Sequence, residues 1–283
     1  MDAIERILKC TQPKQFPDNT SYNSISVAHI SQISKTLGIS GRKIEIIALE
    51  NGAIPERYAR NMKAFSPQDQ AAVLKACVSV VGLGGLGGAV VEILARIGIG
   101  RLNVIDGDSF EESNLNRQFL SQPDLMTQPK AVAAAQRIKA INPSLEVTMH
   151  DRFLDAENGA HLLQDSDVCV DCLDNLNTRF ILERLCKQIG APLVSAAVAG
   201  ACGQVTTVFP EDQGLKLIYG EEANLPPKGA EATLGTVPYS VTFLAAVECA
   251  EVVKILLAKS EILRNKLLVA DLDAGIVDVV SLC

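Results

Sequence analysis

A regular alternation of strand-like and helical segments, starting near residue 71, constrains the fold more than any other feature of this sequence. β-Branched runs at 77–81 and 101–106 are followed by apolar helical patterns at 89–98 and 130–142. Such alternation predicts a mostly parallel sheet with helices on both faces, because each parallel strand pair needs a crossover connection. We therefore expect a doubly wound α/β fold.

Both ends of the chain depart from this alternation. Residues 1–70 combine a polar, turn-rich stretch at 11–24 with amphipathic patterns between 30 and 49, which predicts an N-terminal helical extension. Residues 267–282 alternate like an antiparallel strand pair that closes one side of the sheet. We divide the chain into this extension, 1–70, and a main α/β domain, 71–283.

Composition excludes several classes of protein. The formal net charge is -7, with 33 acidic against 26 basic residues, which argues against a general binder of nucleic acid or of membrane surfaces. A helix-turn-helix pattern at 30–50 has no basic stripe, since Glu45 and Glu50 accompany Lys43. No stretch reaches the roughly 18 to 20 apolar residues of a membrane span. We expect a soluble, cytoplasmic protein.

The eight cysteines do not suggest a disulfide framework. Only Cys169 and Cys172 have CxxC spacing, and they fall in a strand-like run. Residues three apart on a strand point to opposite faces, so these sulfurs are not expected to share a metal. Cys202, just before a strand, and Cys249, inside an apolar helical pattern, are interpreted as core thiols.

A glycine-rich turn at 82–88, GLGGLGG, follows the first strand and opens the first helix of the main domain. Gly82, Gly84 and Gly87 fit the pattern G-x-G-x-x-G, in which glycines let backbone N–H groups approach a phosphate at a helix N-terminus, as in Rossmann-like domains. Asp106 ends the second strand, where a carboxylate receives ribose hydroxyls. A nicotinamide-dependent dehydrogenase and an ATP-using enzyme predict the same residues up to this point.

Two cations and a carboxylate further along favour ATP. Arg117 and Lys130 suit a triphosphate, since fixed cations stabilise charge on departing pyrophosphate, whereas nicotinamide needs apolar room. Each could alone be a surface cation. Asp174 follows a buried strand, and a carboxylate facing a polyanion requires a cation between them, most simply Mg²⁺. Asp174 could instead cap the next helix, a role for which Asn175 is an equal candidate.

Taken together, these segments resemble the ThiF/MoeB/HesA branch of the ubiquitin-activating enzyme superfamily. The resemblance begins near Arg57 and rests on the order of RYARN, GLGGLGG, DGDSFEESNLNRQF, QPKA, INP, DCLDNLNTR and GQVTTVF. It implies a nucleotide-binding set made of Gly82, Gly84, Gly85, Gly87, Asp106, Asp108, Asn114, Arg117, Lys130, Asp174 and Asn175. It also implies that Arg117, Lys130 and Asp174, the Mg²⁺ ligand, act in catalysis, joined by Arg60 from the partner subunit of a homodimer.

The resemblance implies an activity. Members of this branch use ATP and Mg²⁺ to adenylate the C-terminal carboxylate of a small ubiquitin-like sulfur-carrier protein, with a Gly-Gly tail, and release pyrophosphate. A carboxylate ionised near neutral pH needs no protein nucleophile or general base, and all three histidines lie outside the motifs. Adenylation of another carboxylate, a nicotinamide-dependent oxidoreductase and a non-catalytic nucleotide-binding scaffold are the alternatives.

The sequence departs from this branch in two respects. The segments at 211–220 and 269–278, which usually carry two CxxC pairs, hold no cysteine, so we expect no structural zinc. No residue between Cys202 and Cys249 supplies the cysteine often used for thioester or persulfide chemistry, so we expect adenylation to be intact and any sulfur-transfer step to occur elsewhere or not at all. The turn-rich segment 211–236 is a candidate for partner recognition, or else a disordered connector.

Overall fold

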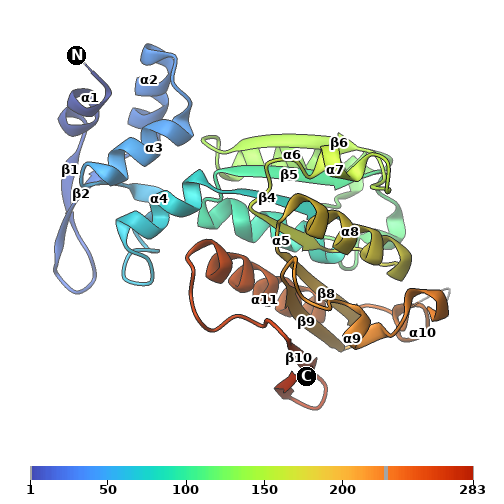
Figure 1. Cartoon of the computed structure of the whole chain (residues 1–283). Helices are drawn as coiled ribbons and strands as arrows, with labels where there is room; N and C mark the ends of the chain where they lie inside the picture. Colours follow the sequence, from blue (N-terminus) through green and yellow to red (C-terminus); the bar gives the residue numbers. More distant parts are fainter. Residues whose placement is uncertain (1, 226–228, 283) are drawn as a thin grey trace.

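The main domain is built on one mixed sheet of eight strands, in the order β11-β10-β9-β8-β7-β4-β5-β6 (Figure 1). The structure is a computed structural model that describes residues 2–225 and 229–282. The strands are β4 (Cys77–Val81), β5 (Arg101–Asp106), β6 (Glu146–Asp151), β7 (Val168–Asp171), β8 (Leu193–Ala199), β9 (Cys202–Val208), β10 (Lys266–Asp271) and β11 (Ile276–Ser281).

Strands β6, β5, β4, β7 and β8 are parallel, whereas β9, β10 and β11 continue the sheet in antiparallel fashion. All residues of the central strand β4 are buried, and Val80 pairs with Val104 on one side and Val170 on the other. Such continuous apolar strands are typical of a parallel sheet covered on both faces. The terminal antiparallel pair confirms the expectation for residues 267–282.

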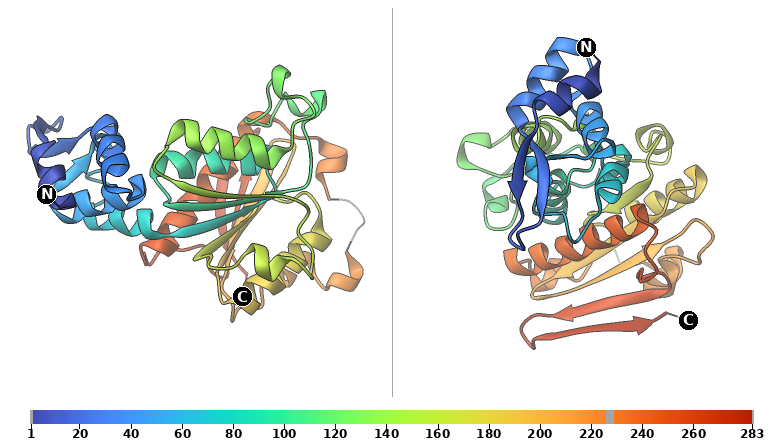
Figure 2. Two further views of the ribbon diagram at one scale, coloured as in Figure 1. Left: turned by 90° about the horizontal axis from the view of Figure 1, so that it is seen from above. Right: turned by 90° about the vertical axis from the view of Figure 1, so that its left-hand side faces the viewer.

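Helices cover both faces of this sheet (Figures 1 and 2). On one face α5 (Gly85–Ile97), α6 (Lys130–Ile141) and α11 (Pro238–Leu256) share a single apolar core with the sheet. On the other face α7 (Gly159–Leu162) and α8 (Leu176–Ile189) form a second core. The doubly wound α/β architecture is therefore confirmed.

The N-terminal extension contains α2 (Val27–Leu37) and α3 (Gly41–Glu50), which match the amphipathic patterns between residues 30 and 49, and a further helix, α1 (Ala3–Lys9). It also contains a three-stranded sheet, β1 (Gln12–Gln15), β2 (Ser21–Ile25) and β3 (Ala53–Pro55), which the sequence patterns did not indicate. The first two strands are short, polar and mostly exposed, so they lack the apolar alternation that reveals a strand.

The extension has its own small apolar core, which includes Ile7, Ile25 and Ile44, and it lies beside one end of the main sheet (Figure 2). The short helix η1 (Glu56–Tyr58) and the helix α4 (Pro67–Lys75) connect it to β4. Residue 70 lies within α4. The division of the chain into an extension, 1–70, and a main domain, 71–283, stays a prediction.

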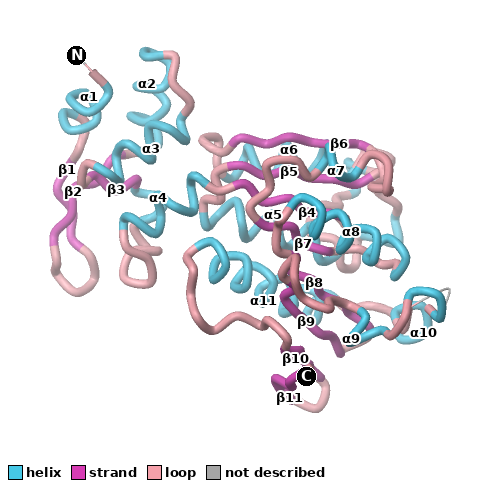
Figure 3. The backbone as a smooth tube through the Cα atoms, viewed as in Figure 1, coloured by secondary structure: helices cyan, strands magenta, loops and turns pink. Residues whose placement is uncertain are grey.

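Two long connections carry short helical turns, as the backbone tube shows (Figure 3). The first joins β5 to α6 and includes η2 (Glu112–Asn114) and η3 (Pro123–Leu125). The second joins β9 to α11 and includes α9 (Lys216–Tyr219), η4 (Glu222–Asn224) and α10 (Glu231–Leu234). Within the described part of the chain, none of the helices has the length and apolarity needed to cross a bilayer.

Candidate nucleotide site

A cleft of about 770 Å³ opens at the carboxyl ends of the parallel strands. Open α/β sheets bind ligands at this edge. Nine of the residues expected in the nucleotide-binding set line the cleft, namely Gly82, Gly84, Gly85, Asp106, Asp108, Arg117, Lys130, Asp174 and Asn175. The fold thus brings together motifs that are far apart in the sequence.

The glycine loop packs too tightly for side chains. Gly82 has φ +87°, and a Cβ there would lie 2.7 Å from the carbonyl oxygen of Cys172. A Cβ on Gly87 would lie 1.8 Å from the carbonyl oxygen of Gly82. Gly84 caps α5 without a side chain, so the amide groups of the first turn are available to an anion. The loop has the geometry of a phosphate cradle.

Asp106 holds this loop against the end of β5. Its two carboxylate oxygens accept hydrogen bonds from the backbone N–H groups of Leu83, at 2.6 Å, and Asp108, at 2.8 Å. Burial raises the pKa of Asp106, and these two amide bonds oppose the rise. A carboxylate oxygen can accept more than one hydrogen bond, so Asp106 can still receive a ribose hydroxyl.

The two expected cations both reach the cleft. Lys130 begins α6; it is buried, and its Nζ lies 3.1 Å from the carboxylate of Asp108. Arg117 donates from Nη1 to the carbonyl oxygen of Ser113, at 3.0 Å, and to Asn116 Oδ1, at 2.9 Å. Both side chains are therefore held by contacts within the protein. A phosphate that enters the cleft could replace these contacts and bind the two cations.

Asp174 and Asn175 divide the two roles that the sequence left open. Asn175 caps α8, because its Oδ1 accepts a hydrogen bond from the N–H of Thr178 at 2.8 Å. Asp174 is exposed at the cleft and has no hydrogen-bond or ion-pair partner among the residues that the structure describes. Its carboxylate is free to meet a cation.

The single carboxylate of Asp174 suits Mg²⁺, which takes few protein ligands, better than a metal ion whose ligands all come from the protein. The described residues contain no cluster of three or more His, Cys, Asp or Glu side chains suited to a metal. Mg²⁺ commonly takes one or two carboxylates and completes its shell with substrate phosphates and water. One unpartnered carboxylate, Asp174, facing a phosphate cradle meets that requirement.

Three expected residues lie away from the cleft lining. Asn114 is buried, and its Oδ1 accepts a hydrogen bond from the N–H of Glu111 at 3.1 Å. Gly87 packs inside α5 against the loop rather than facing the cleft. Arg60 is exposed near Tyr22 of the N-terminal extension. Within one chain Arg60 therefore does not reach the cleft, and its role stays a prediction.

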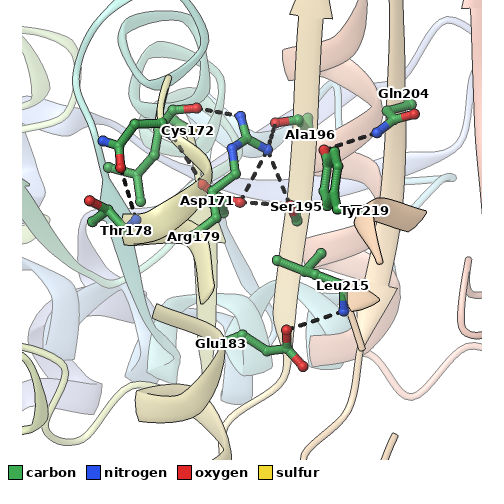
Figure 4. Close-up of polar contacts among 12 residues, drawn as sticks. Asp171, Cys172, Thr178, Arg179, Glu183, Ser195, Ala196, Gln204, Leu215 and Tyr219 are labelled. Carbon is green, nitrogen blue, oxygen red and sulfur yellow. Dashed lines mark hydrogen bonds and ion pairs between the residues drawn. The ribbon is translucent and has the colours of Figure 1, made fainter. Parts of the chain in front are cut away.

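Sequence reasoning missed several residues that line the cleft. Gln118 is buried beside Gly84, and its Oε1 has no hydrogen-bond partner in the described structure. Its position directly after Arg117 could have revealed it. Arg179, Gln204 and Tyr219 also line the cleft (Figure 4), and Gln204 donates to the Tyr219 hydroxyl at 2.9 Å. The last pair joins β9 to α9, a contact with no local sequence signal.

The cysteines agree with expectation except at one position. Cys169 and Cys172 are buried in different apolar cores on opposite faces of the sheet, so they do not form a pair. Cys249 is a buried core thiol, as expected. Cys202 lines the cleft and is only partly buried, so its interpretation as core was wrong. It begins β9 directly after the β8–β9 turn, at the open edge of the sheet.

A buried carboxyl lies below the cleft. Glu248 of α11 is fully buried, its Oε1 has no partner among the described residues, and its Oε2 accepts only a 4.0 Å contact from Cys172 Sγ. Burial, with the charge of Asp171, raises the pKa of Glu248 well above its usual value. The folded protein therefore keeps Glu248 protonated at pH values where the unfolded chain has released that proton.

We expect Glu248→Gln to make the protein more stable at pH 8 while changing little at pH 4. Between the pKa of Glu248 in the unfolded chain and its raised pKa in the folded protein, folding takes up a proton. Over that interval the wild-type free energy of unfolding falls by about 1.4 kcal/mol per pH unit through Glu248. The variant lacks that contribution. Urea unfolding of both proteins between pH 4 and pH 8 measures it, and parallel stability curves would contradict the assignment.

Comparison with known proteins places this fold and cleft in one family. The model of the ThiF family matches residues 58–282. SAMP-activating enzyme E1 of Haloferax volcanii is 34% identical over 221 residues, covering 76% of this chain and 81% of that protein. The heterocyst protein HesA of Trichormus variabilis is 32% identical, covering 77% and 81%.

Longer relatives are also similar. The adenylyltransferase and sulfurtransferase MOCS3 of Drosophila yakuba is 32% identical over 97% of this chain, and the chain spans 60% of that protein's length. Among solved structures, Escherichia coli MccB with ATP has a TM-score of 0.69, covering 99% of this chain and 86% of MccB, and PaaA has a TM-score of 0.66, covering 81% and 82%. Both are 22% identical, which supports the fold alone.

The family match and the named relatives place this α/β chain in the class of the ThiF/MoeB-like adenylyltransferases, enzymes that use ATP. The chain belongs to the ThiF family.

Proposed function

We propose that this protein adenylates the C-terminal carboxylate of a small ubiquitin-like carrier protein with a Gly-Gly tail, using ATP and Mg²⁺ and releasing pyrophosphate. One observation carries the proposal. Arg117 of the β5–α6 connection, Lys130 at the start of α6 and Asp174 of the β7–α8 loop line the same cleft as the glycine loop. The names of two relatives, SAMP-activating enzyme and MOCS3 adenylyltransferase, support the same class of substrate.

The reaction needs alignment and charge compensation more than acid–base chemistry. The carrier carboxylate attacks the α-phosphorus of ATP, its oxygen forms a new bond to phosphorus, and the bond to the β-phosphate oxygen breaks. Asp106 would orient the ribose, while Arg117 and Lys130 would hold the phosphates that leave. Mg²⁺, held by Asp174, would neutralise charge on the phosphate oxygens.

The connection between β9 and α11 is a candidate for carrier recognition. Its first half packs on α8, since the N–H of Leu215 donates to Glu183 Oε2 at 3.1 Å. Its second half reaches β8 through Gly200, whose N–H donates to the carbonyl of Gly235 at 2.8 Å, and Leu234 lines the cleft while 61% exposed. Residues 226–228 of the expected segment 211–236 lie outside the described residues.

A second candidate is the adenylation of a different carboxylate, such as that of a peptide. The similarity to MccB extends over 99% of this chain and includes the N-terminal extension, as does the similarity to MOCS3 over 97% of the chain. A nicotinamide-dependent oxidoreductase is disfavoured, because Arg117 and Lys130 place two cations on the cleft lining, whereas a nicotinamide ring needs apolar surroundings.

Exchange of labelled pyrophosphate into ATP tests the proposal. We expect exchange only when Mg²⁺ and a carrier ending in Gly-Gly are both present, and none with a carrier truncated by those two glycines. Exchange with a peptide carboxylate but not with any carrier would favour the second candidate. Absence of both exchange and ATP binding in calorimetry would refute adenylation.

We further propose that the protein is a homodimer in which Arg60 reaches the active site of the partner subunit. Arg60 is exposed and remote from the cleft of its own chain, as such a role requires. We expect Arg60→Ala and Asp174→Ala to be inactive alone and to regain activity when mixed, because a mixed dimer retains one intact site. Exchange assays on verified mixed dimers measure this, and continued inactivity would indicate that Arg60 acts in its own chain.

A further inference from the structure

Arg179 is a buried arginine at the cleft to which the proposed chemistry gives no role. It lies in the first turns of α8, its side chain is 5% exposed, and it contributes to the cleft lining. Figure 4 shows its guanidinium between the end of β7 and the neighbouring strand β8, beside Ala196. A buried cation in such a place needs partners, because burial without them is costly.

The guanidinium joins the loop after β7 to the middle of β8. Nη2 donates to the carbonyl oxygen of Leu173, in the loop after β7. Nη1 donates to the carbonyl oxygen of Ala196, in β8, at 2.6 Å, and lies 3.3 Å from the carboxylate of Asp171. The Leu173 carbonyl belongs to the peptide unit that leads directly into Asp174. Arg179 thus connects the expected Mg²⁺ ligand to the strand beside it.

Asp171 joins the same loop to β8 through its two carboxylate oxygens. Its Oδ2 accepts a hydrogen bond from Ser195 Oγ at 2.6 Å, and its Oδ1 accepts one from the N–H of Leu173 at 3.1 Å. The peptide groups on both sides of Leu173 are therefore fixed, one by the acid and one by the guanidinium. Burial raises the pKa of Asp171, while Arg179 and Ser195 oppose that rise.

We propose that Arg179 is a positioning residue for adenylation, which locks the loop 172–175 to strand β8 and thereby fixes Asp174 relative to the substrate side of the cleft. The inference rests on the proposed function. The described donors of Arg179 are directed at two carbonyl groups, a hydroxyl and a carboxylate within the protein, so it acts through the loop. Only a guanidinium can make these bonds together, because its donors form a rigid planar fork.

The first test needs no nucleotide. Arg179→Lys keeps the charge but cannot bridge the two carbonyls, so we expect amide hydrogen exchange in residues 172–176 to be faster by at least about tenfold, since local opening governs exchange. Arg137→Lys is the matched control. Arg137 lies on α6, is exposed and pairs with Glu92 of α5, away from the cleft lining, so loop exchange in this variant should equal that of the wild type.

The second test follows the metal and the reaction. We expect Arg179→Lys to raise the Mg²⁺ concentration for half-maximal pyrophosphate exchange by about tenfold, because groups that orient a metal ligand have effects of this size. We expect kcat to fall by about 100-fold through misalignment, with a smaller change in the KM for ATP. Arg137→Lys should match the wild type in all three quantities.

The outcomes separate the possible roles. Unchanged loop exchange in a folded Arg179→Lys protein would overturn the proposal. A lower activity of Arg179→Lys with an unchanged Mg²⁺ concentration for half-maximal exchange would also overturn the proposal. That result would indicate that Arg179 binds a phosphate directly. If Arg179→Lys does not fold, Ser195→Ala weakens the same anchor, and unchanged loop exchange in that variant would equally overturn it. If the wild type shows no exchange of pyrophosphate, the proposed function fails, but the hydrogen-exchange comparison still decides whether Arg179 holds the loop.

Discussion

Replacement of Asp174 by alanine should abolish pyrophosphate exchange while leaving the fold unharmed. We expect the exchange rate to fall by about 1000-fold, because Asp174 would hold the Mg²⁺ ion that compensates the charge developing on the phosphates. The free energy of unfolding should change by less than about 0.5 kcal/mol, since an exposed side chain without partners contributes little to stability. Exchange assays across a Mg²⁺ titration, with urea unfolding, measure both.

Asp124→Ala provides the matched control, because it removes an exposed carboxylate from η3, a turn that does not line the cleft. Its exchange rate and Mg²⁺ dependence should equal those of the wild type. If Asp174→Ala retains robust exchange, the metal assignment is wrong, whatever happens to the ATP affinity. If it loses activity by unfolding, Asp174 has a structural role that its exposure does not suggest.

A single methyl group at Gly87 should destroy nucleotide binding. The new Cβ would lie 1.8 Å from the carbonyl oxygen of Gly82 and 3.3 Å from Cys172 Cβ, so α5 must move away from the loop. We expect Gly87→Ala to lower the free energy of unfolding by about 3 kcal/mol, at the upper end of overpacking effects, because the clash is with backbone. ATP binding should fall below detection in calorimetry, since the loop amides lose their alignment.

Gly190→Ala separates the loss of glycine from the loss of the cradle. Gly190 ends α8 with φ +75°, and a Cβ there would meet nothing within 4 Å. We expect a cost of about 1 kcal/mol from the left-handed backbone alone, with normal ATP affinity. Equal effects of the two substitutions on ATP binding would show that general destabilisation, and not the Gly82–Gly87 contact, explains the defect.

The order of strands and helices in the main domain could be predicted because each element has a local pattern of apolar residues. β-Branched runs such as 77–81 and amphipathic runs such as 89–98 each bury their own apolar side chains, so period and composition suffice. The glycine loop was also readable, since the need for glycine at Gly82 arises from backbone geometry close by. Asn175 was recognisable as a cap candidate for the same reason.

Features that depend on distant partners could not be predicted. Strand β1 is polar and exposed and β2 is mostly polar, so only their pairing with each other and of β2 with β3 makes them a sheet. Cys202 has a strand-like context, but the position of β9 at the edge of the cleft decides that it faces the opening. The sequence placed Gln118 in a motif, but only the packing of the folded chain leaves its amide oxygen buried without a hydrogen-bond partner among the described residues.

The sequence by itself determined the class of this protein: an alternating α/β chain with a glycine cradle, two cations and a carboxylate in an order that matches the ThiF family. The tertiary structure decided which of these groups meet and how each is held. Arg179 contacts Asp171, Leu173, Ser195 and Ala196 only because β7 and β8 lie side by side. Motifs record local chemistry, whereas the alignment of reacting groups depends on contacts between segments that the chain brings together only on folding.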